Sequence, residues 1–358
     1  MVPKISPTSA RAARTALVIS AIALAIASAL MPTPASVIER WYSAGVYPRI
    51  QRVLTTATNL VPIALLDVMV AVLLTVSVAT SVRRLRRLGA RRATAGILAA
   101  LAFSAAVIYL VFLGLWGLNY RRVPLEQKLD YDPVRVTRAR AVAFATAAVS
   151  SVNERYEGAH TAIGTGTDDA LALAFDALQR DLGATRPAVP GVPKRSVFQW
   201  YFPRAGIDGM TDPFFLEVIV NPQVLPFERP FVVAHEWAHL AGYAVESEAN
   251  FIAWLTCARG SRLARYSGAL AAYEHSVSAL AREDLSALPK LDEGPRADLR
   301  AIFERYRRTS PVIRRVAHGL NDGYLRANRV SEGIASYNAV VRLMLGTTLD
   351  GEGTPRRR

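Results

Sequence analysis

Two histidines and a glutamate in the stretch PFVVAHEWAHLAGYAVESEANFIAWL have the types and spacing of a metal hydrolase site. His235 and His239 are four residues apart, so on a helix both imidazoles project from one face and can bind a single tetrahedral Zn2+. Glu236 lies about 100° further round the helix, where its carboxylate can reach water held by the metal without becoming a ligand. The pattern predicts zinc ligands at both histidines and a general base at Glu236.

A zinc hydrolase needs a third protein ligand and keeps the fourth position open for water. Glu246 and Glu248 both have a suitable side chain, but on a helix they point roughly 200° away from each other. We choose Glu246, because Asn250 follows one turn later on the same face and can hydrogen-bond a ligating histidine or carboxylate. Glu248 is then interpreted as a solvated surface carboxylate, and Cys257, the only cysteine, as a small buried hydrophobe.

The motif needs a helix with defined ends and a scaffold that holds it. Pro230 suits the first turn of that helix, and Gly242 suits its C-terminal cap. Just before it, β-branched and aromatic residues predict a small antiparallel sheet, with one strand from residue 196, a turn at 206–209 and a second strand at 214–221. In a peptidase, an edge strand of this sheet can also pair with an extended substrate backbone. Apolar residues at helical spacing predict helices elsewhere, at 132–155, 168–182, 261–283, 298–308 and 321–345.

Three apolar runs fill the N-terminal third of the chain. They cover residues 15–31, 60–82 and 93–118, and each is long enough to cross a bilayer. Asp67, near the start of the second run, is interpreted as a structural residue, because a single acid there can reach the interface or a neighbouring helix. Trp116, at the end of the third run, fits an interfacial aromatic belt. The sequence therefore predicts three transmembrane helices in a lipid bilayer.

The arginines set the orientation of these helices. Residues 1–14 and the loop 83–92 contain Lys and Arg but no acid, which places both on the cytoplasmic side. Residues 119–348 then form a domain outside the cytoplasm, and residues 349–358 a disordered basic tail. The first run could instead be a cleaved signal peptide, which would leave two spans and the same location for the domain.

The net charge of +14 comes from the membrane region. Residues 1–130 carry 15 Lys and Arg against 4 Asp and Glu, whereas the remaining residues carry 28 against 25. A nucleic-acid partner is therefore not expected. One cysteine also excludes an intrachain disulfide framework.

Several segments together resemble one bacterial protein family. They are WGLNYRR at 116–122, GIDGMTDPFF at 206–215, the HEWAH segment, RYSGAL at 265–270 and GIASYNAVVRLML at 333–345. The family is uncharacterised; its members are multi-pass proteins of the cell membrane with a predicted gluzincin-type zinc-peptidase domain. The resemblance implies His235, His239 and Glu246 as ligands and Glu236 as base, with Asn250 where many gluzincins have Asp.

A peptidase of this type also needs a donor for the oxyanion formed during peptide hydrolysis. Candidates are His318, Tyr324 and Tyr337, and Tyr337 ranks first because it follows a glycine in a stretch that matches the family. Glu217 also matches a family position, and we expect it on the strand that faces the site, in contact with the substrate amine or a ligand.

The sequence thus predicts a mainly α-helical protein, with N-terminal transmembrane helices followed by an α+β zincin-like domain that contains the small sheet and the HExxH helix. The function predicted for it is that of a membrane-anchored zinc metallopeptidase, with one Zn2+, that hydrolyses peptides or proteins outside the cytoplasm. The alternative is a non-catalytic, zinc-stabilised sensor or assembly module of the envelope. An intramembrane protease is excluded, because Arg229 and Glu246 flank the motif and the Leu-Asp-Gly at 349–351 lies in a polar tail.

Overall fold

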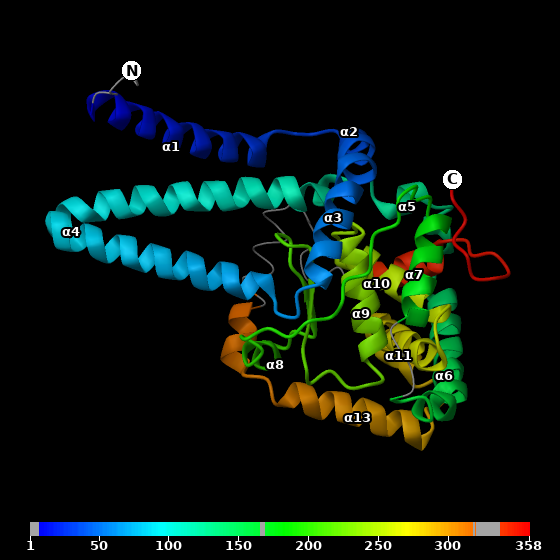
Figure 1. The fold of residues 1–358 in the computed structure, drawn as a ribbon. Helices are drawn as coiled ribbons and strands as arrows, with labels where there is room; N and C mark the ends of the chain where they lie inside the picture. The colour runs from blue at the N-terminus through cyan, green and yellow to red at the C-terminus, as the bar shows by residue number, and fades with distance from the viewer. Residues whose placement is uncertain (1–6, 165–168, 318, 320–336) are drawn as a thin grey trace.

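The computed structural model of the protein describes residues 7–164, 169–317, 319 and 337–358. This part of the chain is mainly helical and contains a small antiparallel sheet. Two long helices, α1 (Pro7–Leu30) and α4 (Leu65–Leu115), project as rods from a globular part that contains the remaining elements (Figure 1).

Helix α4 is a hairpin of two arms. Gly89 breaks its helical backbone with φ 70° and ψ 163°, a conformation that glycine adopts without the steric cost of a Cβ. The arms lie side by side, and α1 packs against α4 along its second arm (Figure 1). The apolar runs at 60–82 and 93–118 correspond to these two arms, and the arginines of 83–92 lie at the tip, far from the globular part.

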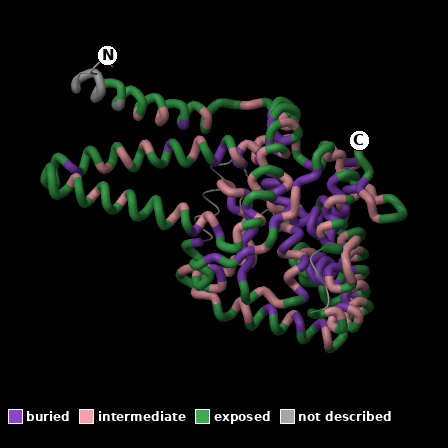
Figure 2. The backbone as a smooth tube through the Cα atoms, viewed as in Figure 1, coloured by how far each residue is buried: buried purple, intermediate pink, exposed green. Residues whose placement is uncertain are grey.

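Among the described residues, α4 is the one helix that is long and apolar enough to cross a membrane. Thr15–Leu30 and Ala35–Asn59 pass the same test only as a pair, and that pair is bent by 110°. Much of the surface of α1 and α4 is exposed (Figure 2), and it includes Leu17, Leu24, Leu74, Val78 and Leu98. The exposed apolar surface makes α4 a candidate membrane helix.

A segment between the rods packs onto the globular part. It consists of α2 (Ala35–Val37), the π-helix η1 (Ile38–Val46) and α3 (Tyr47–Asn59). Side chains of α3 satisfy backbone carbonyls far away in the sequence: the Tyr47 hydroxyl donates to Leu240 O over 2.7 Å, and the Thr55 hydroxyl to Leu216 O over 2.7 Å. The sequence pattern predicts no element here, yet α3 is part of the core around α9.

Four of the helices predicted after the apolar runs are present, with ends shifted by several residues: α6 (Arg138–His160), α7 (Asp169–Asp181), α11 (Arg262–Ala279) and α13 (Glu293–Arg307). Helix α15 (Tyr337–Gly346) covers the end of the fifth. The sequence pattern predicts no separate helix at the short elements η2 (Gly117–Arg121), α5 (Leu125–Lys128), η3 (Pro133–Arg135) and α12 (Arg282–Leu285). Of the predicted helical region 321–345, the residues up to 336 lie outside the described part of the chain.

The small antiparallel sheet is confirmed, but one of its strands lies elsewhere. Strand β1 (Gly209–Thr211) pairs with β2 (Val218–Val220), so β1 begins within the predicted turn. The strand predicted from residue 196 is wrong, since a turn and the short helix α8 (Tyr201–Ala205) occupy this segment. The Asp67 carboxylate fixes that turn by accepting hydrogen bonds from the Ser196 hydroxyl and the Val197 backbone N–H, which confirms Asp67 as a structural residue.

Helices α9 (Arg229–Leu240) and α10 (Glu246–Ala258) form the centre of the core. Trp237 of α9 and Phe251 of α10 are almost fully buried, and Cys257 is buried as predicted. Helix α9 ends where Gly242 takes a φ of 83°, so the glycine cap predicted there is confirmed.

The last residues of the chain pair with one another and with residues 128–131. Leu349 bridges to Pro355, Leu129 bridges to Arg357, and the Asp130 N–H donates to Arg356 O over 2.8 Å. The composition predicts disorder for 349–358, whereas these backbone hydrogen bonds hold the segment against residues 128–131.

Candidate metal centre

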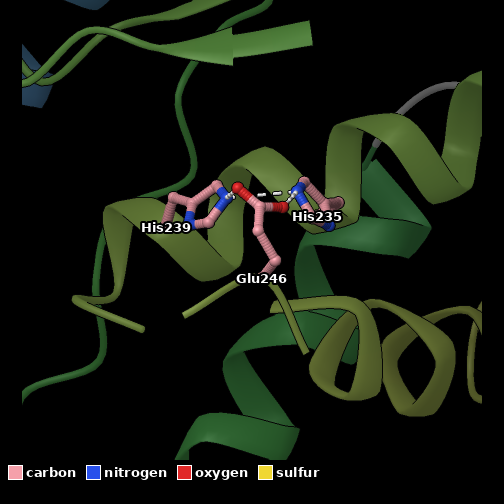
Figure 3. Close-up of side chains that lie close together, drawn as sticks. All are labelled: His235, His239 and Glu246. Carbon is pink, nitrogen blue, oxygen red and sulfur yellow. Dashed lines mark hydrogen bonds and ion pairs between the residues drawn. The ribbon is translucent and has the colours of Figure 1, made fainter. Parts of the chain in front are cut away.

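Three side chains from two helices meet at the end of α9. Their ligand atoms, the imidazole nitrogens of His235 and His239 and a carboxylate oxygen of Glu246, all lie within 4.8 Å of one another (Figure 3). His235 Nε2 is 3.3 Å from Glu246 Oε2, and His239 Nε2 is 3.7 Å from Glu246 Oε1. Glu246 is the first residue of α10, so the turn at 241–245 folds it back over the histidines. The three residues could hold one metal ion with nitrogen and oxygen ligands.

The other ring nitrogen of each histidine is fixed by a hydrogen bond. His235 Nδ1 donates to Asn250 Oδ1 over 2.9 Å, and His239 Nδ1 donates to the carbonyl of Tyr243 over 2.8 Å. A proton on Nδ1 leaves the lone pair on Nε2, the atom that faces Glu246. These two contacts set the tautomer and the ring orientation that a metal would require.

Charge is balanced within this group. Burial disfavours the imidazolium of His235, but the hydrogen bond and charge of Glu246 raise its pKa to about 9. Burial would raise the pKa of Glu246, yet the two histidines lower it to about 2. Burial lowers the pKa of His239 to about 4, so only one imidazole takes a proton near neutral pH. The space between the three groups favours one positive charge, either a proton or a metal ion.

Glu236 lies beside this group on α9 and is buried. Its Oε2 accepts a hydrogen bond of 2.8 Å from the Thr211 hydroxyl, and a Cβ at Gly209 would lie only 2.6 Å from its Oε1. Strand β1 therefore holds the carboxylate from one side. Burial raises the pKa of Glu236 to about 7, although the charge of His235 and the bond from Thr211 oppose this rise. A carboxyl group with a pKa near neutrality can both accept and release a proton.

The Glu248 side chain is buried, so its interpretation as a solvated surface carboxylate is wrong. Its Oε1 accepts the backbone N–H of Leu125 over 2.6 Å, and burial raises its pKa. The partner lies 123 positions away in the sequence, so local spacing could not reveal it. Glu248 ties α10 to the segment that follows the α4 hairpin.

A charged network holds the turn between the ligands. The Arg122 guanidinium makes two 3.0 Å hydrogen bonds to the Glu39 carboxylate, donates to Gly242 O over 2.9 Å and lies over the Tyr243 ring. Lys128 Nζ also donates to Glu39, over 2.9 Å. Since the Tyr243 carbonyl accepts the hydrogen bond from His239, Arg122 and Glu39 support this candidate ligand through the turn.

Residues next to the rods satisfy the last carbonyls of α9. Trp116 Nε1, directly after α4, donates to His239 O over 3.0 Å, and the Tyr47 hydroxyl donates to Leu240 O. Trp116 is buried, so its assignment to an interfacial aromatic belt is wrong. The last carbonyls of a helix have no partner within it, and here the segments on either side of the α4 hairpin supply the donors.

The remaining predicted residues are not brought to this group by any described contact. Glu217 is buried, where its carboxylate pairs with Lys194 Nζ at 2.7 Å and accepts the N–H of Leu66. His318 and Tyr324 lie outside the described residues. Tyr337 is the first residue of α15, and its side chain also lies outside them.

Reasoning from the motif missed Thr211, Arg122 and Trp116. Two of them lie within WGLNYRR and the third within GIDGMTDPFF, the segments that carry the family resemblance.

The chain belongs to a family described as a protein of unknown function (DUF3810), whose model matches residues 42–345. This range includes α3, the hairpin α4, the three candidate ligands, and Arg122 and Lys128 of the charged network, whereas Glu39 precedes it. No curated protein and no solved structure matches the chain.

Proposed function

We propose that the protein is a membrane-anchored zinc peptidase that hydrolyses peptide bonds outside the cytoplasm. The observation that carries the proposal is the convergence of His235, His239 and Glu246 with Glu236 beside them. Two imidazoles and one carboxylate are a ligand set of hydrolytic zinc sites, and they leave a coordination position open.

Each residue has a defined task in this proposal. Bound between the three ligands, Zn2+ would supply a Lewis acid for the peptide carbonyl and lower the pKa of a water molecule. Glu236 takes a proton from the attacking water and passes it to the nitrogen of the leaving amine. Thr211 orients the Glu236 carboxylate through its hydrogen bond. Asn250 and the Tyr243 carbonyl keep both histidines in the ligating tautomer.

Strand β1 is the element best suited to hold an extended peptide. The backbone of β1 is hydrogen-bonded to β2 at alternate residues: Asp208 O accepts from Asn221 N, and Asp212 N donates to Glu217 O. In this register the backbone N–H and C=O groups of residues 208, 210 and 212 point toward β2. The backbone groups of Gly209 and Thr211 then point away from β2. A peptide paired with this edge would lie beside Glu236, in the manner of a strand added to a sheet.

The rods support a multi-pass arrangement with the globular part outside the cytoplasm. Helix α1 and the two arms of α4 lie side by side, and the basic tip of α4 is at the end where α1 begins (Figure 1). The positive-inside rule assigns this end to the cytoplasm and the globular part to the other side. In this arrangement the end of α9 would lie near the membrane surface, because Trp116, which donates to His239 O, directly follows α4.

The test compares wild-type protein with Glu236→Gln, using full-length protein in detergent and a mixed peptide library read by mass spectrometry. Gln keeps the shape of the side chain but cannot act as a base. We expect equal zinc content and a loss of cleavage of roughly 10²-fold or more in the variant. Unchanged cleavage in Glu236→Gln would overturn the mechanism. Bound zinc without cleavage by the wild type would favour the alternative, a zinc-stabilised envelope module.

A further inference from the structure

A cluster of apolar side chains lies exposed on the globular part near the start of α4. We define the membrane-side patch as Val197 (72% exposed), Phe198 (37%), Trp200 (55%), Val312 (68%) and Val316 (56%). Val312 and Val316 are one turn apart on the helical residues 311–317, so they share a face. Exposed apolar groups of this kind mark a contact surface.

Hydrogen bonds join the two parts of this patch to each other and to α4. Ser310 N donates to Arg204 O, which holds residues 311–317 beside α8. The Val197 N–H donates to the carboxylate of Asp67, which lies in the first turn of α4. Figure 1 shows α8 and residues 311–317 on the side of the globular part from which the rods project. The patch therefore lies at the level where α4 leaves the globular part.

Positive charge surrounds the patch. Arg204, Arg308, Arg314 and Arg315 are exposed, and neither α8 nor residues 310–317 contain an acid. The Arg204 guanidinium lies over the Trp200 ring, with 5.8 Å between its Cζ and the ring centroid. Apolar and aromatic side chains that insert among acyl chains, ringed by arginines that bind phosphates, are typical of surfaces that lie in a membrane interface.

We propose that the membrane-side patch lies in the headgroup layer of the outer leaflet and fixes the globular part against an anionic bilayer. The occupant of the surface is lipid, because the patch continues from the start of a candidate membrane helix and because its charge complements phosphate. The inference rests on the proposed insertion of α4. With three rods and this patch in the membrane, the globular part cannot tilt freely about the rods.

The test uses full-length protein in vesicles of phosphatidylethanolamine and phosphatidylglycerol, with a fluorophore at single introduced cysteines. Val197→Cys and Val316→Cys report on the patch, Val76→Cys on α4, and Leu173→Cys is the control, an exposed apolar position on α7. Cys257 is buried, which raises the pKa of its thiol, so the native cysteine does not take up the label. The quenchers are a lipid with a nitroxide near its headgroup for positions 197 and 316, a lipid with a nitroxide within its acyl chain for position 76, and iodide in the water.

We expect the headgroup nitroxide to reduce fluorescence at positions 197 and 316 and the acyl-chain nitroxide to reduce it at position 76. Neither lipid should quench position 173, which iodide should quench most strongly. If the lipid nitroxide does not quench positions 197 and 316 while position 76 is still quenched, the proposed role of the patch is wrong and the insertion of α4 stands. If labels at 197 and 316 escape both quenchers, protein covers the patch and the inference is wrong. No quenching at 76 would overturn the insertion of α4, and the inference with it.

Discussion

Replacing Gly209 by alanine tests whether Glu236 must stay where strand β1 holds it. A Cβ at this position would lie 2.6 Å from Oε1, 2.9 Å from Cγ and 3.0 Å from Cδ of Glu236. Ordinary contacts begin near 3.4 Å. The backbone of Gly209 does not have a positive φ, so alanine can adopt it and the contact is relieved by movement of the Glu236 side chain.

The size of the effect follows from this contact. To reach an ordinary distance, the carboxylate oxygen must move by about 0.8 Å, and a displacement of this order at a reacting group costs roughly 10²-fold in rate. We expect kcat to fall by about this factor with KM little changed, because the base acts in the transition state. Zinc content should equal that of the wild type, since no ligand is touched.

The assay measures cleavage of the best library peptide together with zinc content for each variant. The matched control is Met210→Leu on the same strand, whose side chain points to the other face and packs with Phe202 and Ile219. A volume-conserving change there should leave kcat unchanged. The reasoning is refuted if Gly209→Ala keeps the wild-type kcat, or if it loses zinc.

Three further predictions concern the support of the site. Asn250→Ala removes the acceptor for His235 Nδ1 and should weaken zinc binding by roughly 10–100-fold in a chelator competition. Asn250→Asp keeps an acceptor and should bind zinc as the wild type does. Equal zinc affinities for the alanine variant and the wild type would contradict this role of Asn250. Arg122→Ala leaves the half-buried Glu39 with Lys128 alone and should lower the free energy of unfolding by roughly 1–3 kcal/mol, measured by thermal unfolding in detergent. An unchanged midpoint would refute this prediction. Burial raises the pKa of Glu39, but Arg122 and Lys128 lower it from 4.5 to about 2. The contribution of Glu39 to the free energy of unfolding is therefore complete above pH 4.5 and is lost as the pH falls toward 2. The free energy of unfolding of Glu39→Gln should therefore change less between pH 4.5 and pH 2 than that of the wild type. Parallel curves of this free energy against pH would contradict the prediction.

The sequence pattern identified the local features of the site because helix geometry alone determines them. His239 follows His235 by one helical turn, and Asn250 follows Glu246 by one turn. Spacing was therefore enough to place each pair on one face of its helix. Glu246 was separated from Glu248 by the same argument, and α10 does direct the two carboxylates to different partners.

Long-range contacts could not be read from spacing. Trp116 and Tyr47 reach the end of α9 across 123 and 193 positions of the chain, and Glu39 reaches Arg122 across 83. The strand predicted from residue 196 fails for the same reason, since Asp67, 130 positions before Val197, fixes a turn there. Composition predicts that the rods are apolar. Only the fold shows that the segments beside them donate hydrogen bonds to the end of α9, next to the candidate site.

Zinc content of the full-length protein is the most direct test of the central claim. The full chain is needed, because Trp116, Tyr47 and Glu39 lie outside any domain that begins after the rods. After equilibration with zinc and removal of excess, elemental analysis should give one zinc per chain in the wild type and in Glu248→Gln, which keeps an acceptor for Leu125, and almost none in Glu246→Ala. A wild type without zinc, or equal zinc in Glu246→Ala and Glu248→Gln, would contradict the account.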